Sequence, residues 1–329
     1  MKGSPAAPAD KSVFHSAPHG AAVKRKGGMF PLWRYKFLYL LLLPGLLHVV
    51  IFHYIPMYGI VIAFQNFSPY AGVSSIFQDP QWVGLDHFRA FFQSYYFGRI
   101  IGNTLLISSY KILFGFPAPV ILALLLNEIR HARFKKVVQT ITYLPHFLSW
   151  VILSGLILTL LSPTTGMVSK IIMNLGGPQT NLLASPDFFR PLLVGSEVWA
   201  GVGWGSIIYL AALAGIDPAQ YESAKMDGAG RFQQMLYISL PGMANILSII
   251  FIFAVAGILN AGFEQVLLLY SPNVYSVGDI IDTYVYREGL INNKYSYAQA
   301  VGLFKNVVGL VFLLVTNYIV KRLGKEGIW

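Results

Sequence analysis

The chain has 329 residues, of which 55% are hydrophobic and 12% are charged, and it contains no cysteine. A water-soluble domain of this length carries about twice that share of charged residues, so the composition indicates a membrane protein. The lack of cysteine excludes disulfides, thiolate metal sites and a cysteine nucleophile. A formal net charge of +10 is also found in nucleic-acid-binding proteins, so the distribution of the basic residues has to decide between the two classes.

The first 28 residues are rich in Ala, Pro, Gly, Ser and Lys and contain no long apolar run. Such a segment cannot bury enough surface to order itself, so residues 1–28 are predicted to be a disordered cytoplasmic tail. The apolar run that follows is far longer than the roughly 7–15 residues of a signal-peptide core, and no cleavable signal is predicted. Residues 29–329 are predicted to form one transmembrane domain.

Six apolar runs follow the tail, and each is close to the ~20 residues that span a bilayer. Lipid offers no hydrogen-bond partner to backbone groups, so the predicted fold class is all-α, with six transmembrane helices. Prolines inside the first two runs are expected to kink these helices without ending them. The runs cover roughly residues 37–64, 103–126, 138–161, 192–214, 243–263 and 298–320.

The positions of the 24 lysines and arginines indicate how the chain crosses the membrane. Sixteen lie in the N-terminal segment, the loop after the second run, the stretch 217–241 and the C-terminal tail, whereas six lie in the other three loops. Lys111 and Lys305 lie inside runs. Because basic residues favour the cytoplasmic side, both termini and residues 217–241 are predicted to be cytoplasmic, and no nucleic-acid partner is expected.

The loops on the opposite side are rich in aromatic residues. Residues 84–97, GLDHFRAFFQSYYF, are predicted to form an amphipathic helix that lies in the membrane interface. The tyrosines of residues 264–297 are interpreted as an interfacial aromatic belt, and a docking or sugar-stacking surface is the alternative. They are Tyr270, Tyr275, Tyr284, Tyr286, Tyr295 and Tyr297.

Residues 217–241 are polar although they separate two apolar runs. Asp217 can cap a helix over residues 218–226, because the proline that follows it fits a first helical turn. The glycines of the next sequence, DGAG, break that helix, and a second short helix is predicted over residues 231–239. Small residues at this elbow suit close approach by another protein.

The sequence YESAKMDGAGRFQQMLYISLP resembles the EAA loop in the permease subunits of bacterial ABC importers. That loop reads Glu-Ala-Ala, three residues, Gly, nine residues, Ile, one residue, Leu-Pro, and Ser223 here replaces its first alanine. The stretches YIPMYGIVIAFQNFSP, VQTITYLPHFLSW and SYAQAVGLF are similar to the carbohydrate branch, which includes maltose and alginate-oligosaccharide importers. The matching positions are Glu222, Ala224, Gly228, Ile238, Leu240 and Pro241.

This resemblance implies a type I ABC importer permease fold with an added N-terminal helix, in the bacterial cytoplasmic (inner) membrane. In the family the loop is a coupling helix that docks in a cleft of a cytoplasmic ATPase, where its glutamate contacts the ATPase and its glycine makes the turn. The resemblance also implies a second homologous permease, two ATPase subunits that bind ATP and Mg, and an extracytoplasmic solute-binding protein. The implied coupling residues are Glu222, Ser223, Ala224, Asp227, Gly228 and Ala229.

A phosphate-binding loop needs a glycine, four residues and then Gly-Lys-Ser/Thr. The one Gly-Lys pair of the chain, at Gly324, is followed by Glu326, and Ile319 stands where the first glycine is needed. The chain is therefore predicted to bind no cofactor of its own and to act as a transport subunit rather than an enzyme.

A solute passage is predicted on the polar faces of the last three runs, because polar residues inside spans usually face a cavity. Helix packing and interhelical hydrogen bonds are the alternative role, and GVGWG at residues 201–205 suits close packing. A salt bridge between Glu197 and Lys305 would offset two charges at membrane depth, and an acidic sugar such as an alginate fragment would favour Lys305 as its counter-charge. The predicted passage residues are Asn260, Glu264, Lys305, Asn306, Trp199 and Trp204.

The predicted function is a permease subunit of an ATP-driven importer of oligosaccharides. One alternative is a self-sufficient secondary sugar transporter, which would need internal symmetry and intramembrane carboxylates, of which Glu197 is the only clear one. A membrane scaffold or receptor is the other, and it predicts no dependence on an ATPase. No metal site is predicted, because His48 and His53 are five positions apart in the first run and should not share a helical face.

Overall fold

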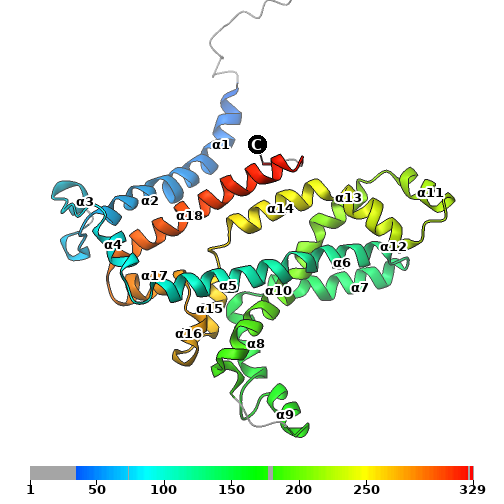
Figure 1. Ribbon diagram of the computed structural model, residues 1–329. Helices are drawn as coiled ribbons and strands as arrows, with labels where there is room; N and C mark the ends of the chain where they lie inside the picture. Colours follow the sequence, from blue (N-terminus) through cyan, green and yellow to red (C-terminus); the bar gives the residue numbers. More distant parts are fainter. Residues whose placement is uncertain (1–34, 73, 177–180, 325–326, 329) are drawn as a thin grey trace, which may run out of the picture. The chain divides into compact units, whose positions relative to one another are not determined.

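The computed structural model describes residues 35–72, 74–176, 181–324 and 327–328, and the regular elements in these ranges are helical (Figure 1). The tail predicted over residues 1–28 lies outside the described residues. Four helices are long and apolar enough to cross a membrane, and the count reaches six when each of two bent helix pairs is one span. The predicted all-α fold with up to six spans is confirmed.

The chain divides into two compact units, Met1–Met57 and Tyr58–Trp329. The described part of the first unit contains α1 (Lys36–Val49), the π-helical turn η2 (Val50–Tyr54) and α2 (Ile55–Met57). In the second unit the membrane helices and their segments are η3 (Tyr58–Phe64), α5 (Phe97–Gly115), α6 (Pro117–Glu128), α7 (Ala132–Tyr143), η5 (Leu144–Phe147), α8 (Trp150–Leu160), α10 (Pro186–Ala214), α14 (Ala244–Ala256) and α18 (Tyr295–Arg322). The connecting elements are η4 (Pro69–Ala71), α3 (Ser75–Gln78), α4 (Asp86–Phe92), α9 (Met167–Asn174), η6 (Leu182–Ala184), α11 (Pro218–Met226), α12 (Arg231–Gln234), η7 (Met235–Ser239), α13 (Leu240–Gly242), α15 (Phe263–Leu269), η8 (Pro272–Val274), α16 (Tyr275–Gly278), α17 (Ile281–Tyr286) and η9 (Arg287–Ile291).

A π-helical turn changes the geometry of the two histidines in the first unit. The rings of His48 and His53 lie 5.9 Å apart, so the prediction that they do not share a face is wrong. The reason is the turn η2, because a π-helix bonds residues five positions apart. No group of three His, Asp or Glu side chains able to hold a metal ion occurs among the residues that the structure describes.

One span of the second unit continues past its prolines, and another bends at a break between two helices. Pro117 occupies the first turn of α6, where its missing N–H is not needed, and α5 and α6 together form one span, Phe97–Glu128. The third span bends by 101° between its two halves, Ala132–Phe147 and Trp150–Leu160. The second half starts at a cap in which Ser149 Oγ accepts a hydrogen bond from the backbone N–H of Ile152.

The fifth span is shorter than predicted. Its helix α14 ends at Ala256, and the chain unwinds before α15 begins at Phe263. Gly262 supports this break with a φ of +89°, a left-handed conformation that favours glycine. The sequence does not reveal this break, because the predicted run 243–263 stays predominantly apolar on both sides of it.

The aromatic connecting segments pack into the protein core. Helix α4 covers only part of the predicted interfacial helix, and Phe91 on it is 1% exposed in a cluster with Ile100, Ile281 and Tyr284. The hydroxyl groups of Tyr284 and Tyr297 lie 2.9 Å apart. The interpretation as an interfacial belt is therefore wrong for Tyr284, since its ring is enclosed by its own chain.

Much of the apolar surface of the spanning helices is not covered by the chain itself. Two further clusters fill the interior, one around Phe189 and Leu193 and one around Leu124 and Leu213. Even so, at most 28% of the residues are buried in the most apolar 18-residue windows of the four long spans. The remaining surface requires lipid or another subunit to cover it.

Candidate coupling loop and solute passage

The elbow at residues 217–241 begins with a capped helix. Asp217 Oδ1 accepts a hydrogen bond of 2.9 Å from the backbone N–H of Ala219, and α11 extends over the predicted residues. At its end, the N–H of Ala229 donates to the carbonyl of Ala224 at 2.8 Å. Gly228 closes this turn with a φ of +81°, as a glycine C-cap does. The predicted helix over 218–226 and the glycine turn after it are both confirmed.

Side chains join the two halves of the elbow to each other. The hydroxyl groups of Tyr221 and Ser239 lie 2.9 Å apart, and Gln234 Nε2 donates to the carbonyl of Ala229 at 2.8 Å. The predicted second helix is only partly α-helical, because α12 gives way to the π-helical turn η7 after Gln234. These bonds tie α11 and the turn after it to the segment that leads into α14.

The tip of the elbow is open to its surroundings. Of the predicted coupling residues, Ala224 and Ala229 are half-buried, and the other four are exposed: Glu222, Ser223, Asp227 and Gly228. Large apolar side chains lie beside them, with Met226 at 88% and Phe232 at 70% exposure. Exposed charge next to exposed apolar surface is the composition of a docking site.

A first cavity of about 420 Å³ lies among α5, α10 and α14 at membrane depth. Lys111 and Glu197 provide its charged groups, and Asn260 borders it from the break after α14. Most of the rest of its wall is apolar or glycine. A cavity that has a few polar groups at fixed positions in an apolar lining is typical of a small-molecule site.

The cationic group of this cavity is held by three acceptors. Lys111 Nζ donates to the carbonyl of Ala261 at 2.8 Å, to Gln265 Oε1, and to Glu197 Oε2 at 3.3 Å. Gln265 is itself fixed by bonds from its Nε2 to the carbonyl of Leu193 and to Ser196 Oγ, both 2.8 Å. The ammonium thus fastens the unwound backbone after α14 to two other helices.

A second cavity, of about 640 Å³, lies on the other side of that break. Asn260 lines it as well, together with Lys305 and Asp282. Lys305 Nζ lies 2.5 Å from Asp282 Oδ1. The salt bridge considered for Glu197 and Lys305 does not form, because each pairs with a different residue.

Comparison with known proteins places the chain in a family. Residues 96–325 match the model of the family described as "binding-protein-dependent transport system inner membrane component". The chain belongs to this family.

The similarity of this inner-membrane component to known proteins extends over almost its whole length. It is 47% identical to the protein LplB of Bacillus subtilis (strain 168) over 313 residues, which are 95% of this chain and 97% of LplB. It is 44% identical to the polygalacturonan/rhamnogalacturonan transport system permease protein YteP of the same organism over 306 residues, 93% of this chain and 94% of YteP. A chain from the crystal structure of a bacterial alginate ABC transporter, in complex with a periplasmic protein bound to alginate pentasaccharide, matches with a TM-score of 0.81 at 41% identity, covering 90% of this chain and 98% of that chain.

The structure brings together only some of the residues predicted for the passage of this inner-membrane component. Asn260 lines both cavities and Lys305 lines the second. Glu264 and Asn306 are exposed and line neither. The exposed ring of Trp204 stacks on His146 with centroids 4.7 Å apart, and the exposed Trp199 also lies outside both cavities.

Sequence reasoning missed the partners of the charged cavity residues. Lys111 was visible as a cation inside an apolar run, but nothing in its neighbourhood pointed to Gln265. Asp282 lies outside the predicted runs, in a segment that the sequence assigns to a loop. Pairing across such distances in sequence is set by tertiary packing, so composition and periodicity do not reveal it.

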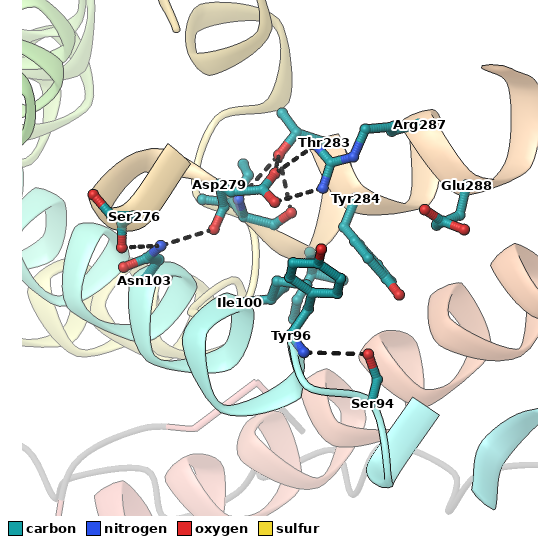
Figure 2. Close-up of polar contacts among 12 residues, drawn as sticks. Ser94, Tyr96, Ile100, Asn103, Ser276, Asp279, Thr283, Tyr284, Arg287 and Glu288 are labelled. Carbon is teal, nitrogen blue, oxygen red and sulfur yellow. Dashed lines mark hydrogen bonds and ion pairs between the residues drawn. The ribbon is translucent and has the colours of Figure 1, made fainter. Parts of the chain in front are cut away.

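A second polar network ties the segment after α15 to the membrane helices (Figure 2). Arg287 binds Asp279 through two hydrogen bonds of 2.6 and 3.1 Å, and Asn103 Nδ2 donates to the carbonyl of Asp279 at 3.1 Å. Arg190 Nη2 donates to Asn103 Oδ1 at 2.8 Å. Burial lowers the pKa of Arg287, but the hydrogen bonds and charge of Asp279 raise it overall, so this guanidinium stays protonated. Burial also raises the pKa of the nearby Tyr270 to about 12, which keeps its hydroxyl neutral.

Proposed function

We propose that this chain is the permease subunit of an ATP-driven, binding-protein-dependent importer of oligosaccharides. The observation that carries the proposal is the near full-length similarity to YteP and to the alginate transporter chain, which includes the elbow and both cavities. The elbow at residues 217–241 faces the cytoplasm together with both termini. The permease works with a second, homologous permease and an extracytoplasmic solute-binding protein.

Energy reaches the permease through the elbow. Glu222 and the exposed apolar residues beside it dock on a cytoplasmic ATPase, and two such subunits bind ATP and Mg. The sequence supports the assignment of ATP binding to a partner subunit, because the Gly-Lys pair of this chain lacks the other residues of a phosphate-binding loop. The bonds inside the elbow support it too, because they join α11 to the segment that leads into α14, so that these parts move together when the tip is displaced.

The solute passes between the two cavities beside the break after α14. Asn260 borders both spaces, so its amide can bond a sugar hydroxyl on either side. Sugars with carboxylates are the favoured class, because YteP is named for polygalacturonan and the matching structure transports the acidic polysaccharide alginate. An acidic sugar then competes with Asp282 for Lys305, because that cation is already paired.

Reconstitution tests this function directly. The permease, its partner permease and the ATPase are placed in proteoliposomes, with binding protein and labelled trisaccharides of galacturonate, alginate or arabinose outside. We expect uptake that requires both ATP and binding protein, and that falls when Glu222 is changed to Lys. Uptake driven by a proton or sodium gradient without ATP would instead establish a secondary transporter.

A further inference from the structure

A third pocket, of about 630 Å³, lies at the end of the second unit away from α11, where α4, η9 and the start of α18 meet (Figure 1). Three segments that are far apart in the sequence build it: residues 66–67, 87–96 and 284–297. Neither Lys111 nor Lys305 lines it, so it is distinct from the two membrane-depth cavities. Tyr295 lines both this pocket and the cavity of Lys305, so the two spaces share a wall.

Tyrosine rings form one side of this pocket. The rings of Tyr96 and Tyr284 lie side by side with centroids 6.2 Å apart (Figure 2), and Tyr297 bonds Tyr284 through their hydroxyl groups at 2.9 Å. Tyr284 is 5% exposed and cannot turn away, whereas Tyr96 is 46% exposed and presents its ring to the space. Polar groups complete the lining, among them Asn66 and Glu288.

The lining of the pocket includes the end of the π-helical turn η9. Asn293 has a φ of +56° and is the one non-glycine residue with a positive φ in the part of the chain that the structure describes. Its Oδ1 accepts a hydrogen bond of 3.1 Å from the Tyr295 hydroxyl. The π-helical turn η9 precedes it, and Glu288 in that turn bonds Lys294 through both backbone and side chain at 2.9 Å. Asn293 therefore ends η9 as an asparagine C-cap does, and these bonds fix the direction of Lys294 and Tyr295 in the lining.

We infer that this pocket is a saccharide-binding vestibule that holds one end of the solute before it enters the passage. The inference rests on the proposed oligosaccharide transport and adds a site to it. The face of a sugar ring packs on the exposed ring of Tyr96, and its hydroxyls bond Asn66 and Glu288. The volume lies within the ~300–1,000 Å³ of small-molecule sites. The Glu288–Lys294 ion pair leaves these two groups with no net charge, so the vestibule recognises hydroxyls rather than carboxylates.

Saccharide binding to the complete transporter in lipid nanodiscs, without binding protein or nucleotide, tests the inference. Saturation-transfer NMR reports which of three trisaccharides, of galacturonate, alginate or arabinose, touch the protein. The pocket variants are Tyr96→Ala and Asn66→Ala, and Tyr70→Ala is the matched control, since Tyr70 is 92% exposed and outside the pocket. Asn260→Ala reports the passage separately, and a monodisperse complex that unfolds at the wild-type temperature confirms that each variant is folded.

We expect each pocket variant to weaken saccharide binding roughly three- to ten-fold, because each removes one aromatic or hydrogen-bonded contact. Tyr70→Ala and Asn260→Ala should keep a saccharide signal. Equal signals in wild type and pocket variants would overturn the inference, and so would the absence of any saccharide signal in the wild type. Pocket variants that weaken only the affinity for the binding protein would overturn it too, because the surface would then dock a protein. ATP-dependent uptake by the wild type is measured in parallel, so a failed vestibule is distinguished from a failed transport function.

Discussion

Two glycines in the elbow differ in backbone conformation although both have room for a side chain. Gly228 has a φ of +81° and nothing within 4 Å of an added Cβ, whereas Gly230 has a φ of −70° and only Gln233 Oε1 at 3.7 Å. We expect Gly228→Ala to destabilise the elbow by about 1–2 kcal/mol through backbone strain alone. Gly230→Ala should be close to neutral. Copurification of the ATPase with each variant measures the difference, and equal losses for both would contradict it.

Lys111 is the residue on which the break after α14 depends most. Replacing it by Met leaves the carbonyl of Ala261 and the amide of Gln265 without their donor, which costs about 1–3 kcal/mol for buried groups. Glu197→Gln should cost less, because that side chain is 42% exposed and keeps an acceptor oxygen. Thermal unfolding of the purified complex compares them, and a Met variant as stable as the wild type would refute this role.

Single residues show clearly what could be predicted from the sequence. The cap at Asp217 and the turn at Gly228 follow from local backbone rules, and the structure has both. The partners of Lys111 and Lys305 do not follow from such rules, because Gln265 and Asp282 reach them from other elements. A cation inside an apolar run predicts that a partner exists but not which one it is.

Close packing between α10 and α7 predicts different effects for alanine substitutions at two glycines of α10. A Cβ at Gly203 would overlap the backbone of Thr142, so α10 and α7 would have to move apart, whereas Gly195 has nothing within 4 Å. Gly203→Ala should therefore destabilise the bundle by about 1–3 kcal/mol, and Gly195→Ala should not. Thermal unfolding of both variants checks this. A Gly203→Ala protein with an unchanged unfolding temperature would contradict the prediction, because α10 and α7 could then move apart without loss of stability.

The sequence GVGWG predicted close packing correctly, but not which glycine provides it. Gly203 and Gly205 meet neighbouring elements, whereas Gly201 lines the first cavity and has nothing within 4 Å of an added Cβ. Helical periodicity gives the relative directions of these residues but not the position of the neighbouring helix. The break after Ala256 was missed for a related reason, since an apolar run carries no mark of where hydrogen bonding changes.

Two ion pairs of the same chemistry differ in their surroundings. Asp279 is 4% exposed beneath Arg287, whereas the side chains of Arg89 and Asp86 are 73% and 66% exposed. Arg287→Ala leaves a buried carboxylate without its cation and should cost about 3–5 kcal/mol, releasing the segment that α16 and α17 form. Arg89→Ala should change nothing measurable. Limited proteolysis between residues 270 and 294 provides the readout, and equal resistance in both variants would contradict the prediction.

Across the whole molecule, uncovered apolar surface and neutral cavities both point to an assembly. Within the spanning helices most of the apolar surface stays open, and each cavity lysine is matched by a carboxylate of the same chain. In the proposed importer, the chain then contributes walls and hydrogen bonds to a passage, while a second subunit and lipid cover its sides. Composition and charge patterning were sufficient to predict the membrane class, because these properties sum over many residues and tolerate local errors.

The proposed orientation can be tested because the chain has no native cysteine to label. Ser223→Cys places a thiol on an exposed residue of α11, and Asn292→Cys places one on an exposed residue just before α18. The start of α18 lies at the end of the second unit away from α11 (Figure 1). In intact cells with a permeabilised outer envelope, a membrane-impermeant maleimide should label Asn292→Cys and not Ser223→Cys. In inverted membrane vesicles the pattern should reverse.

Adding the ATPase to those vesicles should then protect the thiol at position 223, because docking covers the elbow. A thiol that stays reactive in the assembled complex would refute coupling through this loop.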